Sequence, residues 1–503
     1  MNHEFNQLLL TKHRFVLGAL IAFVFFVGIL SMPREEYIAD PMAVRCETVS
    51  LINGGSLAIP AALAQSFGER GQFFVENVTK EKWYCKYGIL NSLIYLPALF
   101  IQKCCEGILS YSSPSRVIYL NLFNLLLALA SAVYLFFIAS RYTKREVVAF
   151  FYVAAAFYTT YWWNYLRGHN SEIYQVLFVL GFYYHLVRSC DGLKTRRHEA
   201  LAGLFFSLLI LTKVVYVILL PVVGLFFILE YYQKRQNQES LFSWCSWRSW
   251  WSLFPSFCSF GLPVALAMGV ILGVNDYKFG SPFESGYGQW QERGQPIFSG
   301  HFFSGLSHFF FNPQYSIFIY FPLLLFALFG YPAFFKKFRF QTCLFLSIGL
   351  VILLVNAKLL TWSGGWGYGP RYLLVMLPLL SLPFLAVLDS IIEQRKKAKA
   401  MLAGGVIALV LLISLKLQMN VNALPFFVNF RLQGALAFLH DPRVDLYFSR
   451  VPFGIINGDL LAFKQGASLP VLESVEKRLS PERAEQLHQF IRSQLTSNYY
   501  FWK

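Results

Sequence analysis

Long apolar runs recur along this chain and constrain its fold more than any other feature of the sequence. Many approach the roughly 20 residues that a helix needs to cross a bilayer. They are continuous rather than alternating, which indicates helices and not the strands of a barrel. Of the 503 residues, 56% are hydrophobic and only 14% are charged, whereas soluble chains carry roughly 25% charged residues. The sequence therefore predicts an all-α polytopic membrane protein with about 11 transmembrane helices. The expected spans are 15–31, 116–139, 147–163, 172–188, 199–212, 215–232, 253–274, 315–335, 342–359, 371–391 and 401–417.

The basic residues gather in short clusters between the apolar runs, and the formal net charge is +16. With the N-terminus in the cytoplasm, all six clusters fall on the cytoplasmic side, as the positive-inside rule expects. This placement favours the bilayer as the partner of the positive charge and argues against nucleic acid. The clusters are Lys12-His13-Arg14, Arg141 with Lys144-Arg145, Lys194 with Arg196-Arg197, Lys234-Arg235, Lys336-Lys337 with Arg339, and Arg395-Lys396-Lys397 with Lys399.

The irregular segments then lie on the opposite side of the membrane. The membrane part, 1–417, contributes a long first loop at 32–115, a second at 275–314 and a short third loop at 361–371, and a C-terminal tail follows at 418–503. Within the first loop, the apolar segment 88–102 is short and contains Pro97. We expect it to form an amphipathic or half-inserted helix at the membrane interface rather than a span.

The cysteines show no metal-ligand spacing, so no residue is assigned to a metal. A divalent cation stays open as a cofactor. Cys46 and Cys85 both belong to the first loop. They form a disulfide if the compartment is oxidising, or they serve as two small apolar side chains.

The third loop, TWSGGWGYGPR, combines tight glycine turns with flat aromatic faces and one guanidinium. Trp366 and Tyr368 suit stacking against a sugar, and Arg371 suits bidentate binding of a phosphate. The alternative is an aromatic belt at the interface, with glycines for close helix packing.

Lys213 stands between two apolar runs, where a cation without a partner is costly, so it is a candidate functional residue. A lysine that snorkels from a helix end is the alternative. His169 and Glu172, in RGHNSE, open a predicted helix and are expected to share one side of it. A carboxylate that only complements the helix dipole is the alternative for Glu172.

Asp40 follows the first predicted helix, in REEYIADP, just outside the membrane. A carboxylate there can act as a general base for an acceptor hydroxyl or amine. Glu35 and Glu36 are close competitors for that role, and a solvated acidic loop residue is the plain alternative.

Taken in order, these motifs resemble the GT-C superfamily of membrane glycosyltransferases, and within it the bacterial relatives of protein O-mannosyltransferases and lipid A aminoarabinose transferases (glycosyltransferase family 39-like). The resembling pieces extend over nearly the whole membrane region. They are Asp40 followed by RCETVSLINGGSLAIP, KYGILNSLIYLP from Lys86, RGHNSE, GLFFSLLILTK ending at Lys213, NDYKFGSPFESGYG from Asn275, FNPQYSIFIYFPLLL from Phe311, and WGYGPRYLLVMLPLL from Trp366.

The resemblance implies an inverting, metal-optional transfer of a sugar from a polyprenyl-phosphate donor to a glycan, lipid or protein acceptor, at the periplasmic face of a bacterial inner membrane. It implies that Asp40 is the catalytic carboxylate and that Lys213 and Arg371 hold the lipid phosphate. Lys86, Tyr87 and Tyr287 lie in the resembling pieces and become candidate substrate contacts.

Two other classes stay open. A transporter or flippase for lipid-linked saccharides is expected to show internal repeats and broken helices that meet at the bilayer midplane. We find no repeat between the two halves, and the unusual residues gather at one face. An oligosaccharide ligase or polymerase has the same chemistry at that face but a different helix scaffold.

Overall fold

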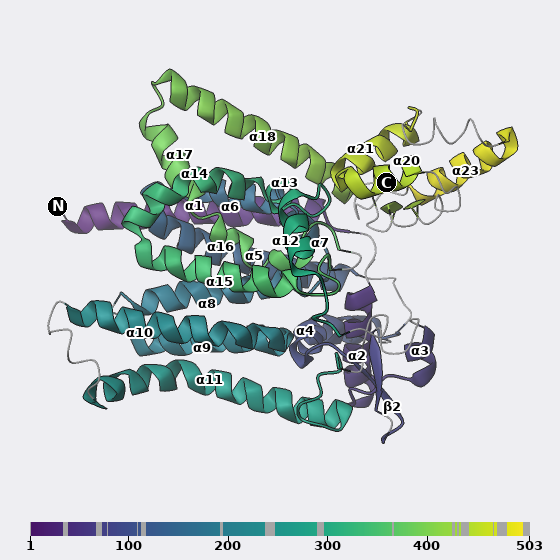
Figure 1. Cartoon of the computed structure of the whole chain (residues 1–503), viewed down its shortest axis with the longest axis horizontal. Coiled ribbons are helices and arrows are strands. Elements are labelled where there is room, and N and C mark those ends of the chain that lie inside the picture. The colour runs from purple at the N-terminus through teal and green to yellow at the C-terminus, as the bar shows by residue number, and fades with distance from the viewer. Residues whose placement is uncertain are drawn as a thin grey trace.

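The protein is a mostly helical bundle with two smaller folded parts at one end (Figure 1). The computed structural model describes residues 2–33, 39–66, 73–77, 79–107, 109–111, 117–191, 195–236, 247–288, 296–364, 367–424, 428–429, 432–433, 442–465, 467–469 and 480–495.

The bundle is built from apolar helices that run back and forth along one direction (Figure 1). The helices and short 3-10 segments of the bundle are α1 (Asn2–Leu30), α5 (Ile118–Tyr142), α6 (Glu146–Tyr158), α7 (Trp162–Arg167), α8 (Glu172–Ser189), α9 (Thr195–Thr212), η1 (Val214–Leu219), α10 (Leu220–Gln236), α11 (Trp247–Phe279), α12 (Phe302–Phe311), α13 (Ile317–Tyr320), α14 (Pro322–Lys337), α15 (Arg339–Ala357), η4 (Arg371–Leu373), α16 (Leu377–Leu380), α17 (Phe384–Glu393) and α18 (Ala398–Ala423).

These helices coincide with the apolar runs of the sequence. Among the described residues, four helices are long and apolar enough to cross a membrane by length and composition alone: α5, the part of α11 at Phe254–Phe279, α15 and α18. Shorter apolar helices lie at Arg14–Leu30, Glu146–Tyr158, Val214–Leu229 and Phe302–Phe311. The protein is therefore a membrane protein with several apolar helices, while the number of about 11 crossings stays a prediction.

Several expected spans are interrupted rather than continuous, and proline explains two of the breaks. The run expected at 371–391 consists of η4, α16 and α17, with Pro378 and Pro383 at the starts of the latter two. The run expected at 315–335 breaks at Phe321, directly before Pro322. Proline lacks a backbone N–H and disfavours helical geometry at the residue before it, so a helix tends to restart there.

Two expectations about the second loop need correction. Helix α11 continues to Phe279, past the expected end of the span at 274, and α12 forms inside the segment expected to be a loop. The sequence FFSGLSHFFF is apolar enough to pack one side, and Phe309 is fully buried. The glycine at 305 lets α12 approach the end of α15 closely, since a Cβ there would lie 2.3 Å from the carbonyl oxygen of Ala357.

The turns that carry basic clusters lie at the end of the bundle where the N-terminus is found. Figure 1 shows the α14–α15 and α17–α18 turns at that end. Ion pairs tie other basic turns together there, with Arg141 on Asp191 at 2.5 Å and Arg145 on Asp389 at 3.3 Å. The shared end agrees with the charge pattern of the sequence. Which side of a membrane it faces stays a prediction.

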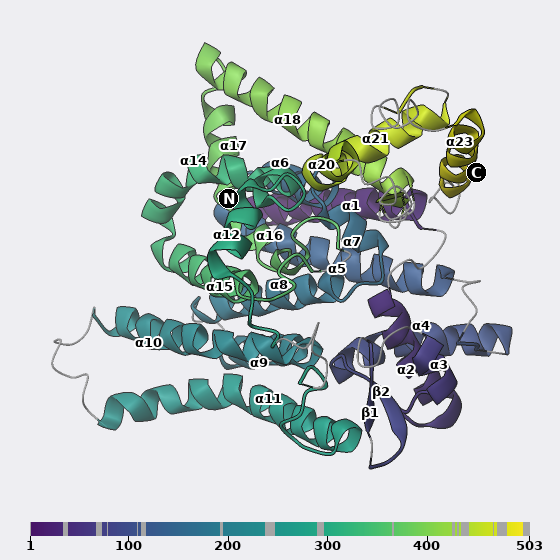
Figure 2. The same cartoon turned by 45° about the vertical axis from the view of Figure 1, so that its right-hand side comes forward.

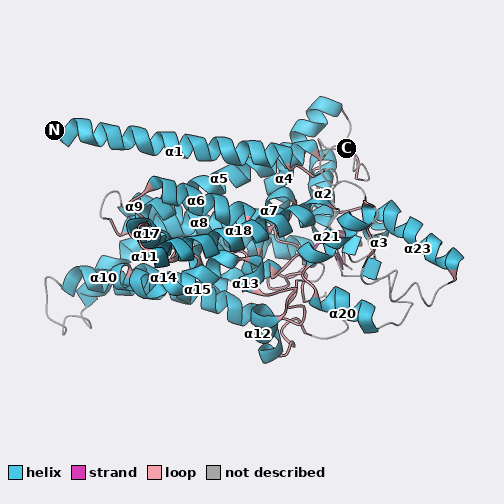
Figure 3. Ribbon diagram, turned by 90° about the horizontal axis from the view of Figure 1, so that it is seen from above, coloured by secondary structure: helices cyan, strands magenta, loops and turns pink. Residues whose placement is uncertain are grey.

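The first loop folds against the opposite end of the bundle. It contains α2 (Ala39–Gly54), α3 (Ala61–Ser66), an antiparallel hairpin of β1 (Phe74–Asn77) and β2 (Lys82–Cys85), and α4 (Ile89–Glu106). Figure 2 shows this part next to the ends of α9 and α11, and Figure 3 shows α2 and α3 on the side away from the N-terminus. The exposed side of α4 is apolar, with Leu93, Phe100 and Ile101 each more than 40% exposed. This face is what a helix at a membrane interface requires.

The C-terminal tail has a small core of its own. It contains α20 (Pro442–Arg450), α21 (Phe453–Lys464) and α23 (Pro481–Gln494), and α18 leads into it (Figure 1). The core residues are Leu424, Val428, Leu432, Phe448, Ile456, Leu460, Phe463, Leu469, Leu487, Ile491 and Leu495. Helix α18 continues to Ala423, past the expected boundary at 417, and the division into 1–417 and 418–503 stays a prediction.

Candidate active site

Asp40 lies in the first turn of α2, where a carboxylate complements the positive end of the helix dipole. Its Oδ2 lies 2.8 Å from Nη2 of Arg371. Its Oδ1 accepts a hydrogen bond of 2.6 Å from the hydroxyl of Tyr87. Both carboxylate oxygens of Asp40 therefore have a partner. One contacts the guanidinium of Arg371, which is distant in the sequence, and the other accepts from the hydroxyl of Tyr87 in the first loop.

Arg371 begins the short helix η4 after the glycine-rich third loop. Gly364 and Gly369 have φ angles of +79° and +64°, which residues with a Cβ rarely adopt. These turns bring the arginine back against the start of α8, where its Nε donates to Oε1 of Glu172 at 2.9 Å. One guanidinium thus bridges two carboxylates, Asp40 and Glu172.

Lys213 completes the group from the junction of α9 and η1. Its Nζ donates to the same Oε1 of Glu172 at 3.4 Å and lies 4.7 Å from the ring centre of Tyr372. The other carboxylate oxygen, Oε2 of Glu172, is buried and has no hydrogen-bond partner among the described residues. A buried acceptor without a donor is costly, so this oxygen is a candidate to receive a ligand hydroxyl.

The four charged groups differ in their access to the outside. The side chains of Glu172 and Arg371 are 2% and 6% exposed, whereas those of Lys213 and Asp40 are 21% and 28% exposed. The buried pair anchors the site, and the partly exposed base and ammonium can meet a substrate. The four formal charges sum to zero, so an added anion competes with the carboxylates for the two cations.

Electrostatics keep Asp40 ionised. Burial raises the pKa of its carboxyl, but the charge of Arg371, the hydrogen bond from Tyr87 and the charge of Lys86 together outweigh burial, and the pKa is lowered from its ordinary value. Burial, followed by the negative charge of Asp40, raises the pKa of Tyr87 well above its ordinary value. Tyr87 therefore remains protonated and keeps donating.

Lys86 and Tyr287 lie next to this group. The Nζ of Lys86 is 5.4 Å from the ring centres of both Tyr87 and Tyr287, and the two rings meet edge to face at 6.4 Å. Lys86 is 5% exposed and contributes to the lowering of the Asp40 pKa. The first and second loops thus both contribute side chains to the surroundings of Asp40.

Two residues expected at the site lie elsewhere. His169 bonds to Oδ1 of Asn121 at 2.8 Å. It precedes the first turn of α8, so the helical spacing that was expected to align it with Glu172 does not apply. Tyr368 is buried against the tail, with its hydroxyl on Gln418 at 3.2 Å and its ring 5.9 Å from that of Phe453.

Trp366 and the competing acids Glu35 and Glu36 lie outside the described residues. Tyr372, whose ring lies against both cations of the site, was not singled out from the sequence. Its position directly after Arg371 was the available signal. The sequence also did not predict a second buried ion pair, between Glu47 and Lys278.

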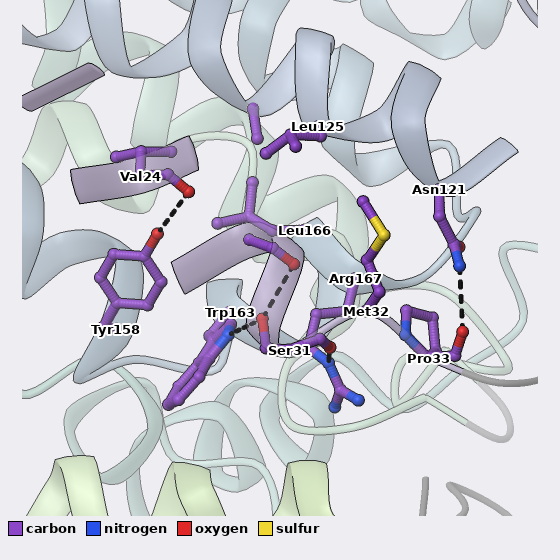
Figure 4. A pocket seen from close by; sticks show the side chains of 12 residues that line it. Val24, Ser31, Met32, Pro33, Asn121, Leu125, Tyr158, Trp163, Leu166 and Arg167 are labelled. Atoms are coloured by element: carbon purple, nitrogen blue, oxygen red, sulfur yellow. Dashed lines mark hydrogen bonds between the residues drawn. The ribbon is translucent and has the colours of Figure 1, made fainter. Parts of the chain in front are cut away.

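A separate small pocket lies between α1, α5, α6 and α7 (Figure 4). Its walls are apolar residues such as Val24 and Leu125, and Arg167 lies at its polar end, where the Nε donates to the carbonyl oxygen of Ser31. None of the predicted site residues lines this pocket. It is therefore distinct from the group around Asp40.

No set of three His, Cys, Asp or Glu side chains within the described ranges could hold a metal ion. Both carboxylates of the site bond to Arg371 instead. The structure has no disulfide between Cys46 and Cys85, both of which are buried.

The fold and this group of residues define a membrane protein with a polar, charged centre at the end of the bundle opposite the N-terminus. No protein-family model matches the sequence, and no curated protein sequence does. Solved structures do resemble it.

ArnT from Cupriavidus metallidurans, bound to undecaprenyl phosphate, aligns with 96% of this chain and 76% of its own length, at 12% identity and a TM-score of 0.48. The oligosaccharyltransferase of Archaeoglobus fulgidus aligns with 88% of this chain at 11% identity and a TM-score of 0.49, over 60% of its own length. The Pmt1-Pmt2 protein O-mannosyltransferase complex of S. cerevisiae, bound to its sugar donor, aligns with 51% of this chain and 33% of its own, at 14% identity and a TM-score of 0.38.

All three identities lie below 15% and all three TM-scores below 0.5, so these likenesses carry no argument about the function of this chain. The chemistry proposed below rests on the residues of the site.

Proposed function

We propose that the chain is a membrane glycosyltransferase. It moves a sugar from a polyprenyl-phosphate donor to a glycan, lipid or protein acceptor, with inversion, at the periplasmic face of a bacterial inner membrane. The observation that carries the proposal is the contact of a partly exposed carboxylate, Asp40, with Arg371, which also shares Glu172 with Lys213. A base and two cations around one accessible point are what this transfer requires.

The role of general base falls to Asp40. Its lowered pKa keeps it deprotonated at neutral pH, and its 28% exposed side chain can reach an acceptor. In the proposed step, Asp40 takes the proton of the acceptor hydroxyl or amine as that atom attacks the anomeric carbon of the sugar. The new glycosidic bond forms on one face of the sugar while the bond to phosphate breaks on the other, which inverts the configuration.

The leaving group is the polyprenyl phosphate, which gains negative charge as its bond to the sugar breaks. Preorganised cations stabilise such developing charge strongly when water is excluded. Arg371 has its Nε on Glu172 and its Nη2 on Asp40, so donor phosphate binding displaces one of these contacts. Loss of the contact to Asp40 leaves that carboxylate free to accept the acceptor's proton.

Sugar recognition is assigned to the surrounding aromatic and polar groups. Tyr87 and Tyr287 present ring faces and hydroxyls beside Asp40. The orphaned Oε2 of Glu172 is a ready acceptor for a sugar hydroxyl. The stacking role expected from the sequence stays a proposal for Trp366.

The test uses the purified protein in lipid nanodiscs with synthetic polyprenyl-phosphate sugars, and it measures both donor binding and release of the polyprenyl phosphate. Asp40→Asn should lower turnover by about 10²–10⁴-fold, the usual contribution of a general base, with donor affinity retained. Arg371→Ala and Lys213→Ala should weaken donor binding. Asp191→Asn, at the other end of the bundle, is the matched control and should change neither quantity.

Two results would count against the proposal. If Asp40→Asn turns over as fast as the parent protein, Asp40 is not the general base. If both cation variants keep full donor affinity, Arg371 and Lys213 do not bind the donor phosphate. A flippase or other transporter would instead move the lipid-linked sugar across vesicle membranes with its sugar–phosphate bond intact. Mass analysis of the recovered lipid separates these outcomes.

A further inference from the structure

A second ion pair lies buried where the first loop meets the bundle. The Nζ of Lys278, in the last turn of α11, is 2.5 Å from Oε1 of Glu47 on α2. Their side chains are 1% and 0% exposed. Because two charges taken out of water lose several kcal/mol of hydration each, such a pair needs further polar contacts to be tolerated.

Those contacts come from several elements of the first loop. Ser92 of α4 donates to Oε2 of Glu47 at 2.5 Å. The Nζ of Lys278 donates to the carbonyl oxygen of Cys85 at the end of β2, at 3.1 Å. Asn77 of β1 donates to the carbonyl oxygen of Lys278 at 3.0 Å. Lys278 thus contacts α2 and both strands of the hairpin, and its partner Glu47 contacts α4.

The same elements hold the proposed base. Asp40 and Glu47 are seven residues apart on α2, which is about two helical turns, so they lie on one side of that helix. Cys85 is followed directly by Lys86 and Tyr87, and Tyr87 donates to Asp40. The lysine therefore fixes both the helix that carries the base and the short segment that hydrogen-bonds to it.

Stability alone is a weak reason for such a pair. Replacing a buried ion pair by apolar residues of similar volume is often neutral or stabilising, whereas removing one partner is strongly destabilising. A pair of this kind is better explained by geometry, because its contacts are directional and apolar packing is not.

We propose that Lys278 and Glu47 are positioning residues, which hold α2 and the Cys85–Tyr87 segment so that Asp40 meets Arg371 and the substrate at the required distance. The inference rests on the proposed transferase function. It adds that the end of α11, which leads into the second loop, sets the geometry of the base in the first loop.

The experiment compares Lys278→Met, Glu47→Gln and the double variant Glu47→Leu with Lys278→Met in the nanodisc assay. We expect the double variant to keep the parent melting temperature while its kcat falls by about 10²-fold, the cost of a misplacement of about 1 Å. The donor KM should stay near the parent value, since Arg371 and Lys213 are untouched. Arg141→Met with Asp191→Leu, which removes an exposed ion pair at the other end, should leave kcat unchanged.

A double variant that recovers both the melting temperature and kcat would overturn the proposal, because the pair would then serve stability alone. The single variants are not decisive, since an unpaired buried charge can prevent folding, and the double variant avoids that difficulty.

A second measurement does not depend on transfer. Spin labels replacing Met42 on α2 and Phe303 on α12, both exposed, should give a narrow distance distribution in the parent and a broad one in the double variant. Equal widths would overturn the positioning role even if the parent proves inactive. An inactive parent with a broadened variant would instead reject the transferase proposal and keep the structural tie.

Discussion

At the scale of single residues, the properties of Asp40 depend on its two neighbours. An aspartate in water is already ionised at neutral pH. This one also receives a hydrogen bond from Tyr87 and an ion pair from Arg371, which fix the position of its carboxylate. Burial raises its pKa, whereas the charge of Arg371, the hydrogen bond from Tyr87 and the charge of Lys86 lower it, and the net shift is downward. The residue is therefore ionised and partly exposed at once.

Tyr87→Phe tests this balance through the pH dependence of the proposed reaction. The variant loses a hydrogen bond that lowers the pKa of Asp40, so that pKa rises. A base with a higher pKa is protonated at higher pH, and the acid limb of log(kcat/KM) should therefore move to higher pH. Steady-state rates measured from about pH 3 to about pH 8, a range that begins below the ordinary aspartate pKa of about 3.9, would show the shift.

Tyr84→Phe is the matched control for this measurement. Tyr84 lies on β2, three residues before Tyr87, but its ring lies against Tyr277 rather than Asp40. An acid limb that stays in place in Tyr87→Phe, or that moves equally in both variants, would contradict the role given to the Tyr87 hydroxyl.

At the scale of the secondary-structure elements, close packing against the end of α9 fixes the position of the start of α4. A Cβ on Gly88 would lie 2.4 Å and 2.6 Å from the carbonyl oxygens of Leu211 and Thr212. Asn91 of α4 strengthens the contact by donating to the carbonyl oxygen of Thr212 at 3.0 Å. Because Lys213 follows directly, this contact sets the distance between the Tyr87 segment and the cations.

Gly88→Ala should push α4 away from the end of α9, since backbone atoms cannot move aside cheaply. We expect a loss of about 1–3 kcal/mol in the free energy of unfolding, as for other overpacked sites, and a raised donor KM. Thermal unfolding and donor titration measure the two effects.

Gly54→Ala serves as the control, because a Cβ at Gly54 meets nothing within 4 Å. It should change stability by no more than about 0.5 kcal/mol. Equal behaviour of the two alanine variants would show that the approach of α4 to α9 is not tight.

For the whole molecule, the basic turns and the Asp40 group lie at opposite ends of the bundle. The positive-inside rule then predicts a cytoplasmic α17–α18 turn and an outer face that carries the site. We expect a cysteine near residue 365 to react with an impermeant thiol reagent added to intact cells, and a cysteine replacing Lys396 to react only after lysis.

The labelling requires a background without the native cysteines, because several of them, such as Cys104 and Cys343, are exposed. The reverse pattern of labelling would place the site in the cytoplasm. It would leave the bundle intact and exclude the periplasmic reaction.

Much of the architecture could be predicted from the sequence, because the length of an apolar run and the charge of the residues that flank it are local properties. The runs at 116–139 and 342–359 became α5 and α15 with small changes of boundary. Asp40, Lys213 and Arg371 could be singled out for a similar reason, since a charge beside an apolar helix is conspicuous.

Partners could not be predicted in the same way. His169 and Glu172 are three residues apart, yet their side chains bond to Asn121 and Arg371. Helical spacing failed there because α8 begins only at Glu172. Lys278 was assigned to no site because the sequence does not show that α11 continues past the apolar run and that its last turn contacts the first loop.

The sequence by itself determined that this is a membrane protein. Charged side chains are costly in lipid, so long runs of apolar residues with charges only between them identify such a chain. It also determined which charged residues stand at the mouths of the helices. Only the tertiary structure decided that Arg371 lies between Asp40 and Glu172, the latter 199 positions away along the chain. Contacts at that separation depend on how the helices pack against one another, and no local pattern in the chain encodes them.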